Sequence, residues 1–447
     1  MTTNVVKHIV ITGKIGAGKS TYAKKLEKQL KKLGNSVTNL DYDKLGHEIL
    51  GEDQDIRKKI ANDVFNNPEK LEKLEKKLHP KIYNLAKTMI QNDLIEEKVS
   101  SQEKSLIAIH QIPIYWKTKD LFKETFQKYP DKIFVVSANV ETITKRLKES
   151  RNMTNEQITA RLKSQQTESI PKDTINPEII IQINTDSNCN QEDYYQNKMS
   201  NLNNQFYNEN ASSFSDTRIK PWEGWIKGME IISPLLFDTN LPITNPKILD
   251  LASGNGRFEK YLSNKFSNIK FDITMADNCL PLAKNFNSTK SENIKFKPVD
   301  IISNWETESK NIQNNFDLVC SFGFMHHIPS FERRLKFIKD LTEKTTNLLF
   351  LSFWGFANSE NGKIKAQKTT TNYILNSGFI DLETEDYILG WKNKLNTFRY
   401  CHNFSKDEIS EIINLLQKNG EIISCFQADG KSKDMNTYII WQKINKK

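Results

Sequence analysis

The 447-residue sequence has no apolar run near the ~20 residues that a membrane-spanning helix needs. Its start, MTTNVVKHIV, lacks the basic or arginine-rich pattern of a targeting segment. The cysteines are few, odd in number and without a C-x-x-C pair: Cys189, Cys279, Cys320, Cys401 and Cys425. These absences argue against a cysteine zinc site and a disulfide framework, and they predict a cytoplasmic protein with no membrane partner.

The charge balance does not by itself identify a partner. The formal net charge is +9, but it is unevenly divided. Residues 1–190 hold 32 Lys and Arg against 25 Asp and Glu, a net +7, whereas residues 191–447 hold 32 against 30, a net +2. A surplus of this size suits a protein that binds small anions as well as one that binds nucleic acid.

The pattern along the chain predicts two fused α/β domains, 1–186 and 205–447. Residues 184–204 hold seven Asn and no sustained apolar period, which predicts a linker at 187–204. On either side, short β-branched runs alternate with Lys- and Glu-rich amphipathic stretches, as in parallel βαβ units. The expected strands are 5–12, 105–112, 132–138 and 179–183, then 247–251, 271–276, 316–322, 347–353, 421–425 and 437–442.

A phosphate-binding loop is predicted in the first domain. The string GKIGAGKS, residues 13–20, follows an apolar strand and opens a helix, the context in which this motif indicates a nucleotide site. Its glycines let backbone N–H groups approach phosphate oxygens. Lys19 is expected to reach the β- and γ-phosphates of ATP, and Ser20 to ligate Mg²⁺. The candidate nucleotide-binding residues are Gly16, Ala17, Gly18, Lys19, Ser20 and Thr21.

Two aspartates, Asp41 and Asp43, follow the apolar stretch that ends at Leu40. Phosphoryl transfer needs a group that accepts the proton of the attacking hydroxyl, and a carboxylate within hydrogen-bond reach can do so. An aspartate at such a place can equally be a turn residue or a helix cap. The residue types alone therefore leave both roles open.

These motifs occur in the order seen in dephospho-CoA kinases. GKIGAGKST, the DYD pair with His47, the stretch VFNNPEKLEKLEKKLHPKI (residues 64–82) and RLKSQ (residues 161–165) resemble that family over about residues 5–186. The resemblance implies a P-loop NTPase fold, a three-layer α/β/α domain, that transfers the ATP γ-phosphate to the ribose 3′-hydroxyl of dephospho-CoA. It implies that Asp43 is the base. Lid arginines, Arg161 with Arg146 or Arg151, would neutralise phosphate charge.

The first domain departs from that family at three points. The segment between Asp43 and His79 is shorter than the family's substrate-binding subdomain, and the middle lid arginine is displaced to Arg151. Lys117 stands where the family has an acidic residue. These departures leave open another phosphate acceptor, such as a related nucleotide, a nucleoside or an RNA end. They also leave open a non-catalytic, nucleotide-dependent module that serves the second domain.

The second domain opens with a strand and a glycine turn, ILDLASGNGRF, residues 248–258. The strand ends at Asp250, and small residues in the turn let the backbone approach a cofactor closely. Asp277 follows the second strand, where it can accept both ribose hydroxyls of an adenosine ligand, and Asp300 follows the third, near the adenine amino group. An NAD-binding sheet shares such a turn, but no second nucleotide-binding half follows.

This constellation resembles class I S-adenosylmethionine (SAM)-dependent methyltransferases over about residues 205–447, and it comprises Asp250, Gly254, Gly256, Asp277 and Asp300. Ala252 stands where that family usually has its first glycine. The resemblance implies a Rossmann-like domain with SAM as cofactor. Residues 206–225 and 398–416, with HHI at 326–328 and ERR at 332–334, resemble the eukaryotic tRNA wobble-uridine methyltransferases that esterify 5-carboxymethyluridine. That subgroup implies a tRNA partner.

A carboxylate acceptor is ionised at pH 7, so its methylation needs a cationic holder and alignment with the sulfonium methyl, not a general base. Arg218 and Arg399 are the candidates for holding the carboxylate or neighbouring phosphates. Aromatic rings that could wall or stack on an extruded base, or simply pack in the core, are Tyr207, Trp222, Tyr400 and His402. His326 and His327 are interpreted as pocket walls and not as metal ligands.

A different methyl acceptor also fits the sequence. RNA affinity usually depends on Lys and Arg contacts, and the second half is close to neutral. A small carboxylic acid is therefore an alternative acceptor. The sequence carries no signal of oligomeric state.

Overall fold

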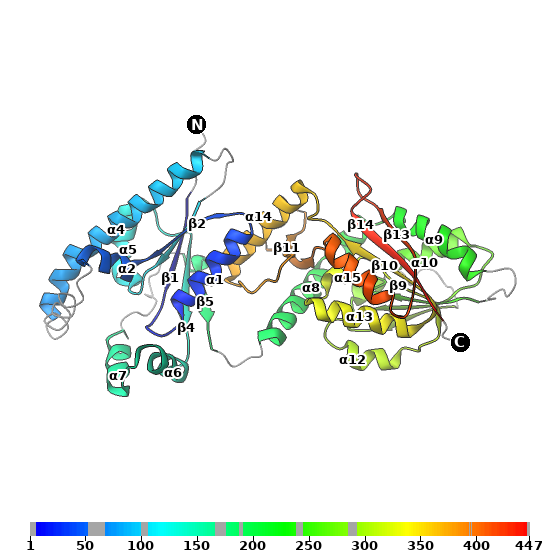
Figure 1. The fold of residues 1–447 in the computed structure, drawn as a ribbon, viewed down its shortest axis with the longest axis horizontal. Coiled ribbons are helices and arrows are strands. Elements are labelled where there is room, and N and C mark those ends of the chain that lie inside the picture. Colours follow the sequence, from blue (N-terminus) through cyan, green and yellow to red (C-terminus); the bar gives the residue numbers. More distant parts are fainter. Residues whose placement is uncertain are drawn as a thin grey trace. The chain divides into compact units, whose positions relative to one another are not determined.

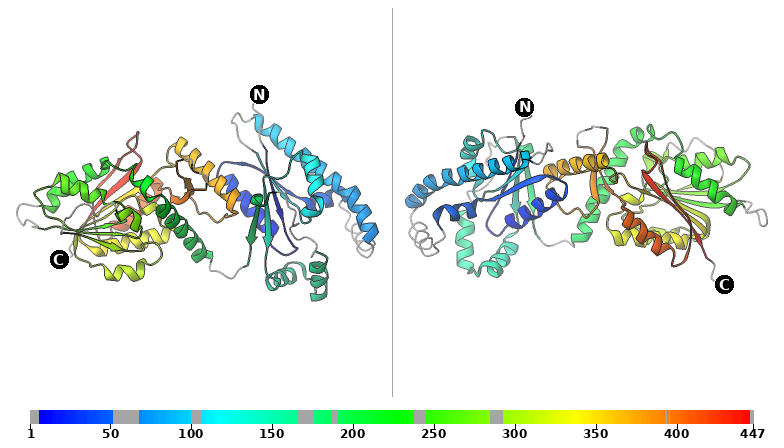
Figure 2. Two further views of the ribbon diagram at one scale, coloured as in Figure 1. Left: turned by 180° about the vertical axis from the view of Figure 1, so that it is seen from behind. Right: turned by 45° about the horizontal axis from the view of Figure 1, so that its top comes forward.

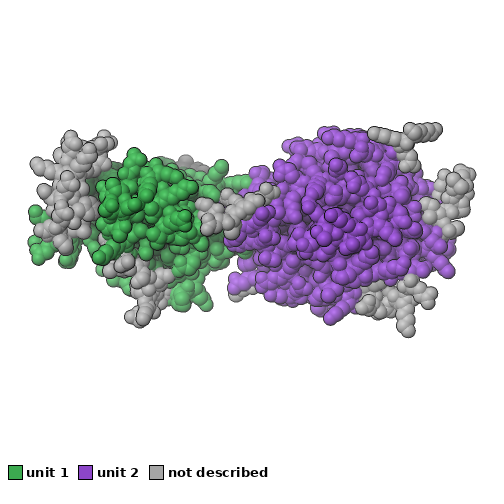
Figure 3. Space-filling model, turned by 90° about the horizontal axis from the view of Figure 1, so that it is seen from below, with its two compact units in different colours: residues 1–190, 371–380 green, residues 191–370, 381–447 purple. Residues whose placement is uncertain are grey.

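The structure, a computed structural model, describes residues 6–51, 68–99, 106–165, 176–186, 191–237, 245–284, 293–392, 394 and 396–444. The chain divides into two compact units, which Figure 3 colours separately: unit 1 is residues 1–190 with 371–380, and unit 2 is residues 191–370 with 381–447. No helix in these ranges is long and apolar enough to cross a membrane. Residues 64–67 of the 64–82 motif and Cys189 lie outside the described residues.

Unit 1 contains a five-stranded, fully parallel sheet in the order β2-β3-β1-β4-β5 (Figure 1). Because parallel strands end at the same edge, the loops that follow β1, β2 and β3 meet there. The strands are β1 Lys7–Thr12, β2 Ser36–Asp41, β3 Leu106–Gln111, β4 Lys132–Ser137 and β5 Ile180–Asn184. The helices are α1 Lys19–Lys32, α2 Tyr42–Leu50, α4 Pro68–Val99, α5 Tyr115–Phe126, α6 Val140–Arg151 and α7 Asn155–Ser164.

Local sequence explains where these helices begin. Gly18 starts α1 with a left-handed backbone, φ 94°, which a residue with a side chain rarely adopts. The side chains of Asp41, Asn139 and Thr154 cap α2, α6 and α7 by accepting backbone N–H groups. Each helix that borders the nucleotide loop therefore has a fixed start.

A chain of buried polar rings crosses the core of unit 1. Nδ1 of His8 lies 3.0 Å from Nε2 of His110, whose Nδ1 lies 3.0 Å from the hydroxyl of Tyr42. Burial lowers the pKa of His8 to about 4 and also lowers the pKa of His110. Both imidazoles are therefore neutral at pH 7.

Unit 1 should lose stability as the pH falls from 6.5 toward 4. In this range the unfolded state, with an ordinary His8 pKa of 6.5, binds more protons than the folded state, whose His8 pKa is about 4. A shift of this size corresponds to about 3 kcal/mol of unfolding free energy. Hydrogen exchange along a urea gradient, read on peptides from β1 and β3, measures it. His8→Gln should make the pH dependence shallower, and an unchanged dependence would contradict this account.

Unit 2 contains a seven-stranded sheet in the order β13-β14-β10-β9-β6-β7-β8, in which β14 runs antiparallel to both of its neighbours. Figure 2 shows this sheet from two further sides. A separate hairpin pairs β11 with β12. The strands are β6 Lys247–Leu251, β7 Asp272–Asp277, β8 Ile294–Pro298, β9 Phe316–Ser321, β10 Thr345–Trp354, β11 Asp386–Gly390, β12 Phe398–His402, β13 Gly420–Ala428 and β14 Asn436–Lys443.

Two apolar clusters pack this sheet, one with Leu249, Val319 and Ile439 and the other with Ile248, Leu318 and Ile440. Consecutive residues of one strand fall in different clusters because side chains alternate between the faces of a sheet. The helices are α8 Gln191–Ser215, α9 Glu223–Leu236, α10 Arg257–Lys265, α11 Leu280–Ala283, α12 Trp305–Glu308, α13 Phe331–Lys344, α14 Glu360–Ser377 and α15 Lys406–Leu416. The fold confirms the expectation of a parallel-sheet α/β domain followed by a Rossmann-like domain.

The prediction of an Asn-rich linker at 187–204 is wrong for residues 191–204, which form the first half of α8. This helix buries polar side chains beside apolar ones: Ser200 and Asn203 are as buried as Tyr195 and Met199. A helix whose buried residues are partly polar cannot be recognised from regularly spaced apolar residues. Asn203 has a specific role, because its Oδ1 accepts from the backbone N–H of Tyr400 at 2.8 Å.

Candidate active sites

The phosphate loop of unit 1 joins β1 to α1. A Cβ on Gly13 would lie 2.1 Å from the carbonyl oxygen of Val136, so only glycine fits there. Gly16 has a φ of 72° and Gly18 a φ of 94°, both in the left-handed region. Nζ of Lys19 donates to the carbonyl oxygens of Gly13 and Lys14 at 2.8 and 3.0 Å. Of the predicted nucleotide-binding residues, Gly16, Ala17 and Gly18 thus end the loop, and Lys19, Ser20 and Thr21 begin α1. A glycine loop and a lysine at a helix start fit a phosphate group.

ATP binding should weaken above pH 8. Burial and the nearby Arg151 lower the pKa of Lys19 to about 8, so its ammonium deprotonates between pH 7 and 9. If a neutral Lys19 cannot pair with phosphate, the affinity should fall about tenfold over this range. Titration with a fluorescent ATP analogue measures the affinity. Lys19→Arg is the control because an arginine stays charged, and its affinity should not fall. A constant wild-type affinity would contradict the prediction.

Asp43 and Asp41 divide the two roles that the sequence left open. Asp41 is the cap of α2, and its Oδ1 accepts from the backbone N–H groups of Asp43 and Lys44 at 3.2 and 3.3 Å. Burial, and then Asp41, raises the pKa of Asp43, while Lys19, His47 and Arg151 pull it down. Asp43 is thus a solvent-accessible carboxyl beside the phosphate-loop lysine, a suitable place for a proton acceptor.

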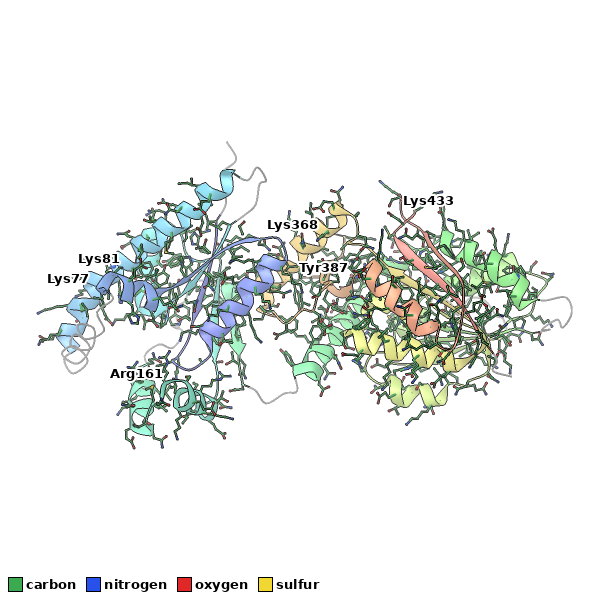
Figure 4. The ribbon with its side chains drawn as sticks, viewed as in Figure 1. Lys77, Lys81, Arg161, Lys368, Tyr387 and Lys433 are labelled. Atoms are coloured by element: carbon green, nitrogen blue, oxygen red, sulfur yellow. The ribbon has the colours of Figure 1, made fainter. Side chains whose placement is uncertain are left out.

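The lid arginines differ in their contacts. Arg146 was predicted to neutralise phosphate charge, but it donates to Oγ1 and the carbonyl oxygen of Thr185, at 2.9 and 2.6 Å. Oγ1 of Thr185 in turn donates to the carbonyl oxygen of Ala17 at 2.7 Å, so Arg146 braces the loop that follows β5 against the phosphate loop. Arg151 acts electrostatically on both Lys19 and Asp43. Figure 4 shows the exposed Arg161 on α7.

Two further contacts involve residues that the sequence comparison with the kinase family singled out. Lys117, where the resembled family has an acid, pairs with Glu75 of α4 at 2.5 Å. Oε1 of Gln165, the end of the RLKSQ motif, accepts from the backbone N–H of Ile15 at 2.8 Å. The motif therefore reaches the phosphate loop through its glutamine, a role that the sequence analysis did not assign.

Unit 2 holds a cavity of about 960 Å³. It lies at the carboxyl ends of β6, β7 and β9, where ligands bind in doubly wound sheets. Two groups of predicted residues line it: Asp250, Ala252, Gly254 and Asp277 on one part, and Tyr207, Arg218, Trp222, His326, His327 and Arg399 on another. A cavity of this size can hold a cofactor together with an acceptor group.

The cofactor part is built from strand ends. The carboxylate of Asp277 accepts from the backbone N–H groups of Gly254 and Cys279 at 2.8 and 2.7 Å, which fixes it at the end of β7. Ala252 and Gly254 have left-handed backbones, with φ of 60° and 58°. Gly256, the cap of α10, does not line the cavity. An open turn beside a fixed carboxylate fits the ribose of SAM.

Asp300, expected near the adenine amino group, binds the backbone of its own turn. Its Oδ1 accepts from the backbone N–H groups of Ile302 and Ser303, at 3.1 and 3.0 Å, so the side chain closes a turn. Asp300 does not line the cavity, whereas its neighbours Val299 and Ile301 do. An aspartate after a strand can bind a ligand or accept backbone N–H groups of the following turn, and Asp300 accepts backbone N–H groups.

Arg218 and Arg399 share an aromatic cage. Their guanidinium carbons lie 3.5 and 5.9 Å from the centre of the Phe214 ring, and each lies 5.6 Å from that of Trp391. Burial, and then Arg399, lowers the pKa of Arg218 to about 10. Among the described residues, no carboxylate forms an ion pair with either arginine. A buried and a half-buried guanidinium without a carboxylate partner form a receptor for an anion.

Tyr207 connects this cage to the HHI segment. Nδ1 of His327 lies 2.9 Å from the carbonyl oxygen of Tyr400 and 3.1 Å from Nδ2 of Asn203. Nε2 of His327 lies 2.7 Å from the hydroxyl of Tyr207. Nη1 of Arg399 lies 3.4 Å from the same hydroxyl. Burial and Arg399 lower the pKa of His327 to about 3, so it stays neutral.

The suggestion that Tyr400 and His402 wall the base pocket is wrong. Neither lines the cavity. The hydroxyl of Tyr400 donates to Asp386 at 2.8 Å, and His402 lies between Asp386 and Glu408, at 2.7 and 2.6 Å. These two carboxylates raise the pKa of His402 against the effect of its burial. The network holds β12, and with it Arg399, in place.

Three side chains could in principle hold a metal ion: His326, His327 and Cys401, whose ligand atoms lie within 4.8 Å of one another. The sequence analysis did not foresee Cys401 beside the histidines. Both nitrogens of His327 are already hydrogen-bonded, and the charges that act on His326 include Arg399 and Arg218. Burial also raises the pKa of the Cys401 thiol to about 12. This environment does not favour a cation.

Arg257 is a cavity residue that the sequence analysis missed. It begins α10, and its guanidinium carbon lies 5.1 and 4.8 Å from the centres of the Trp222 and Trp225 rings. Nη1 donates to the carbonyl oxygen of Lys220 at 3.0 Å, and burial lowers the pKa of Arg257 to about 10. Its position directly after Gly256 of the glycine turn was the sequence feature that could have identified it as a cavity residue.

Known proteins resemble the two units separately. Residues 7–184 match the family model described as dephospho-CoA kinase, and residues 229–417 match one described as a methyltransferase domain. A dephospho-CoA kinase of Aquifex aeolicus is 33% identical over 180 residues, 36% of this chain and 81% of that protein. One of Dehalococcoides mccartyi is 29% identical over 189 residues, 37% of this chain and 83% of that protein.

Among solved structures, a SAM-dependent methyltransferase of Methanosarcina mazei is 16% identical and covers 46% of this chain and 96% of its own, with a TM-score of 0.35. The kinase relatives and the two family matches agree with the geometry of the sites. The chain belongs to the dephospho-CoA kinase family through residues 7–184, and residues 229–417 of its second unit match a methyltransferase domain.

Proposed function

We propose that unit 1 phosphorylates the ribose 3′-hydroxyl of dephospho-CoA. The observation that carries this is the position of Asp43, which acts electrostatically on Lys19 at the phosphate loop. Asp43 accepts the proton of the 3′-hydroxyl as its oxygen attacks the γ-phosphorus, and ADP leaves. Lys19 and Arg151 balance the phosphate charge. Ser20 is the residue of the loop that would hold Mg²⁺, and the ion would supply positive charge that stabilises the transferred phosphoryl group.

A panel of acceptors tests this proposal. The full chain, ATP and Mg²⁺ are incubated with dephospho-CoA, adenosine or an RNA with a free 3′ end, and the products are identified by mass spectrometry. We expect phosphorylation of dephospho-CoA alone. Phosphorylation of another acceptor would replace the substrate. ATP binding without transfer to any acceptor would favour the nucleotide-dependent module.

For unit 2 we propose methyl transfer from SAM to a carboxylate, namely the carboxymethyl group of a tRNA wobble uridine. The pair Arg218 and Arg399 carries this, because a half-buried and a buried guanidinium group without a carboxylate partner suit an anionic acceptor. A carboxylate oxygen attacks the methyl carbon, and the carbon–sulfur bond electrons return to sulfur. The products are a methyl ester and S-adenosylhomocysteine (SAH), and no proton is transferred.

The aromatic cage supports a base as the carrier of this carboxylate. Phe214, Trp391 and Trp354 surround Arg399, and flat rings of this kind can stack on an extruded base. Transfer of tritiated methyl from SAM is compared on tRNA that bears 5-carboxymethyluridine, on unmodified tRNA and on the free nucleoside. Labelling of the modified tRNA alone supports the proposal. Labelling of small carboxylic acids but not tRNA would favour the alternative acceptor.

A further inference from the structure

Two acidic side chains are buried beside the cofactor cavity, and only one of them faces it. Asp250, near the end of β6, is 3% exposed and lines the cavity. Glu259, on α10, is 0% exposed and does not line it. The role of Asp250 in cofactor binding accounts for the first carboxyl but not for the second.

The hydrogen bonding of this pair indicates a shared proton. Within the described residues, no N–H or O–H group outside this pair donates to Oδ1 of Asp250 or to either oxygen of Glu259. The two carboxyl groups hydrogen-bond each other, and a bond between two carboxyl groups needs a proton. Two ionised carboxylates side by side in a buried site would repel strongly. The unliganded pair therefore holds one proton and one negative charge.

The groups around the pair keep this proton in place. Asp277, from β7, is negative and raises the pKa of both carboxyls. Cys320, from β9, is a buried thiol whose pKa is raised by burial, Asp250 and Glu259, so it stays neutral. Burial raises the pKa of Asp250 and brings that of Glu259 to about 7. The proton can thus leave near neutral pH if a positive charge arrives.

We infer that Asp250 and Glu259 release their shared proton when SAM binds and recover it when the product is SAH, so that the pair favours the sulfonium over the thioether. SAM carries one more positive charge than SAH, on sulfur, and Asp250 faces the cavity that receives it. The doubly ionised pair balances the sulfonium charge in a site of low dielectric. After transfer the sulfonium charge is gone, and one proton returns from solvent to the pair.

Calorimetry of the full chain tests this without a methyl acceptor. SAM and SAH are titrated at pH 7 in buffers of different ionisation enthalpy, and the dependence of the heat on the buffer gives the protons released. We expect SAM to release roughly half a proton more than SAH. The ratio of the SAH to the SAM dissociation constant should rise roughly three- to tenfold from pH 6 to 8. Equal proton release for the two ligands would overturn the inference.

Variants test whether the proton released on SAM binding comes from Asp250 and Glu259. Glu259→Gln mimics the protonated side chain permanently, so the difference in proton release and the pH dependence of the ratio should vanish. Glu421→Gln, an exposed glutamate on β13, is the matched control and should keep both. A difference that persists in Glu259→Gln would also overturn the inference. The comparison of SAM with SAH on the wild-type chain decides the matter even if that variant folds poorly.

This inference depends on SAM binding and not on the identity of the acceptor. If tRNA proves not to be methylated, the calorimetric result is unaffected. If proton release is equal for both ligands, the arginine cage and its acceptor are unaffected. The two proposals about unit 2 therefore fail separately.

Discussion

Replacing Arg399 with glutamine should lower methyl transfer by about 10²- to 10³-fold while leaving the dissociation constant of SAM within about threefold of the wild-type value. Arg399 is buried, and its Nε has no hydrogen-bond partner among the described residues. If it holds the acceptor carboxylate, its removal leaves that anion buried without a counterion, which costs about 2–5 kcal/mol. Single-turnover transfer to modified tRNA, together with calorimetric titration of SAM, measures both quantities.

Two further variants sharpen this test. Arg399→Lys keeps the charge but loses the forked donors, so we expect an intermediate loss of about tenfold. Lys418→Gln removes an exposed cation just after α15 and should leave transfer unchanged. Equal activity of wild-type protein and Arg399→Gln would show that the cage does not hold the acceptor. A parallel loss of SAM binding would show instead that Arg399 shapes the cofactor part of the cavity.

Regular patterns explain which parts of the fold could be predicted from the sequence. The expected strand at 247–251 is β6, and most of the other expected strands differ from the observed ones by one or two residues at an end. The central strands β1, β3, β6 and β9 are continuous apolar runs that lie inside their parallel sheets and are buried on both faces. The β11–β12 hairpin was not expected. Its strands carry Asp386, Arg399 and His402, which are buried by partners far away in the sequence.

Backbone-bound side chains explain the errors in the candidate sites. Asp300 and Arg146 were chosen by residue type and spacing, but both are engaged by nearby backbone groups. In the phosphate loop and the glycine turn, Gly16, Gly18, Ala252 and Gly254 have the left-handed backbones that such tight turns require. Glu259 was missed, although it lies next to Phe258 and three residues before Leu262 on the buried face of α10. A charged residue at such a core position was the signal available.

Replacing Asp43 with asparagine should lower the kcat for phosphorylation of dephospho-CoA by about 10²- to 10⁴-fold, the usual effect of removing a general base. Asparagine has nearly the same size but cannot accept the hydroxyl proton. The dissociation constant of ATP should change little, because Nζ of Lys19 and the glycine backbone form the loop independently of Asp43. A coupled assay of ADP formation and fluorescence titration of ATP measure these two quantities.

Asp120→Asn is the matched control, since it removes an exposed aspartate from α5 and should keep full kcat. The pH profile separates a base from a structural role. Burial and Asp41 raise the pKa of Asp43, so kcat of the wild-type chain should fall as the pH drops through that raised value, when the carboxylate is protonated. The residual activity of Asp43→Asn should not show this fall. If the variant keeps more than a tenth of the wild-type kcat with the same acid limb, another group accepts the proton, and the placement of Asp43 beside Lys19 serves the loop and not the chemistry.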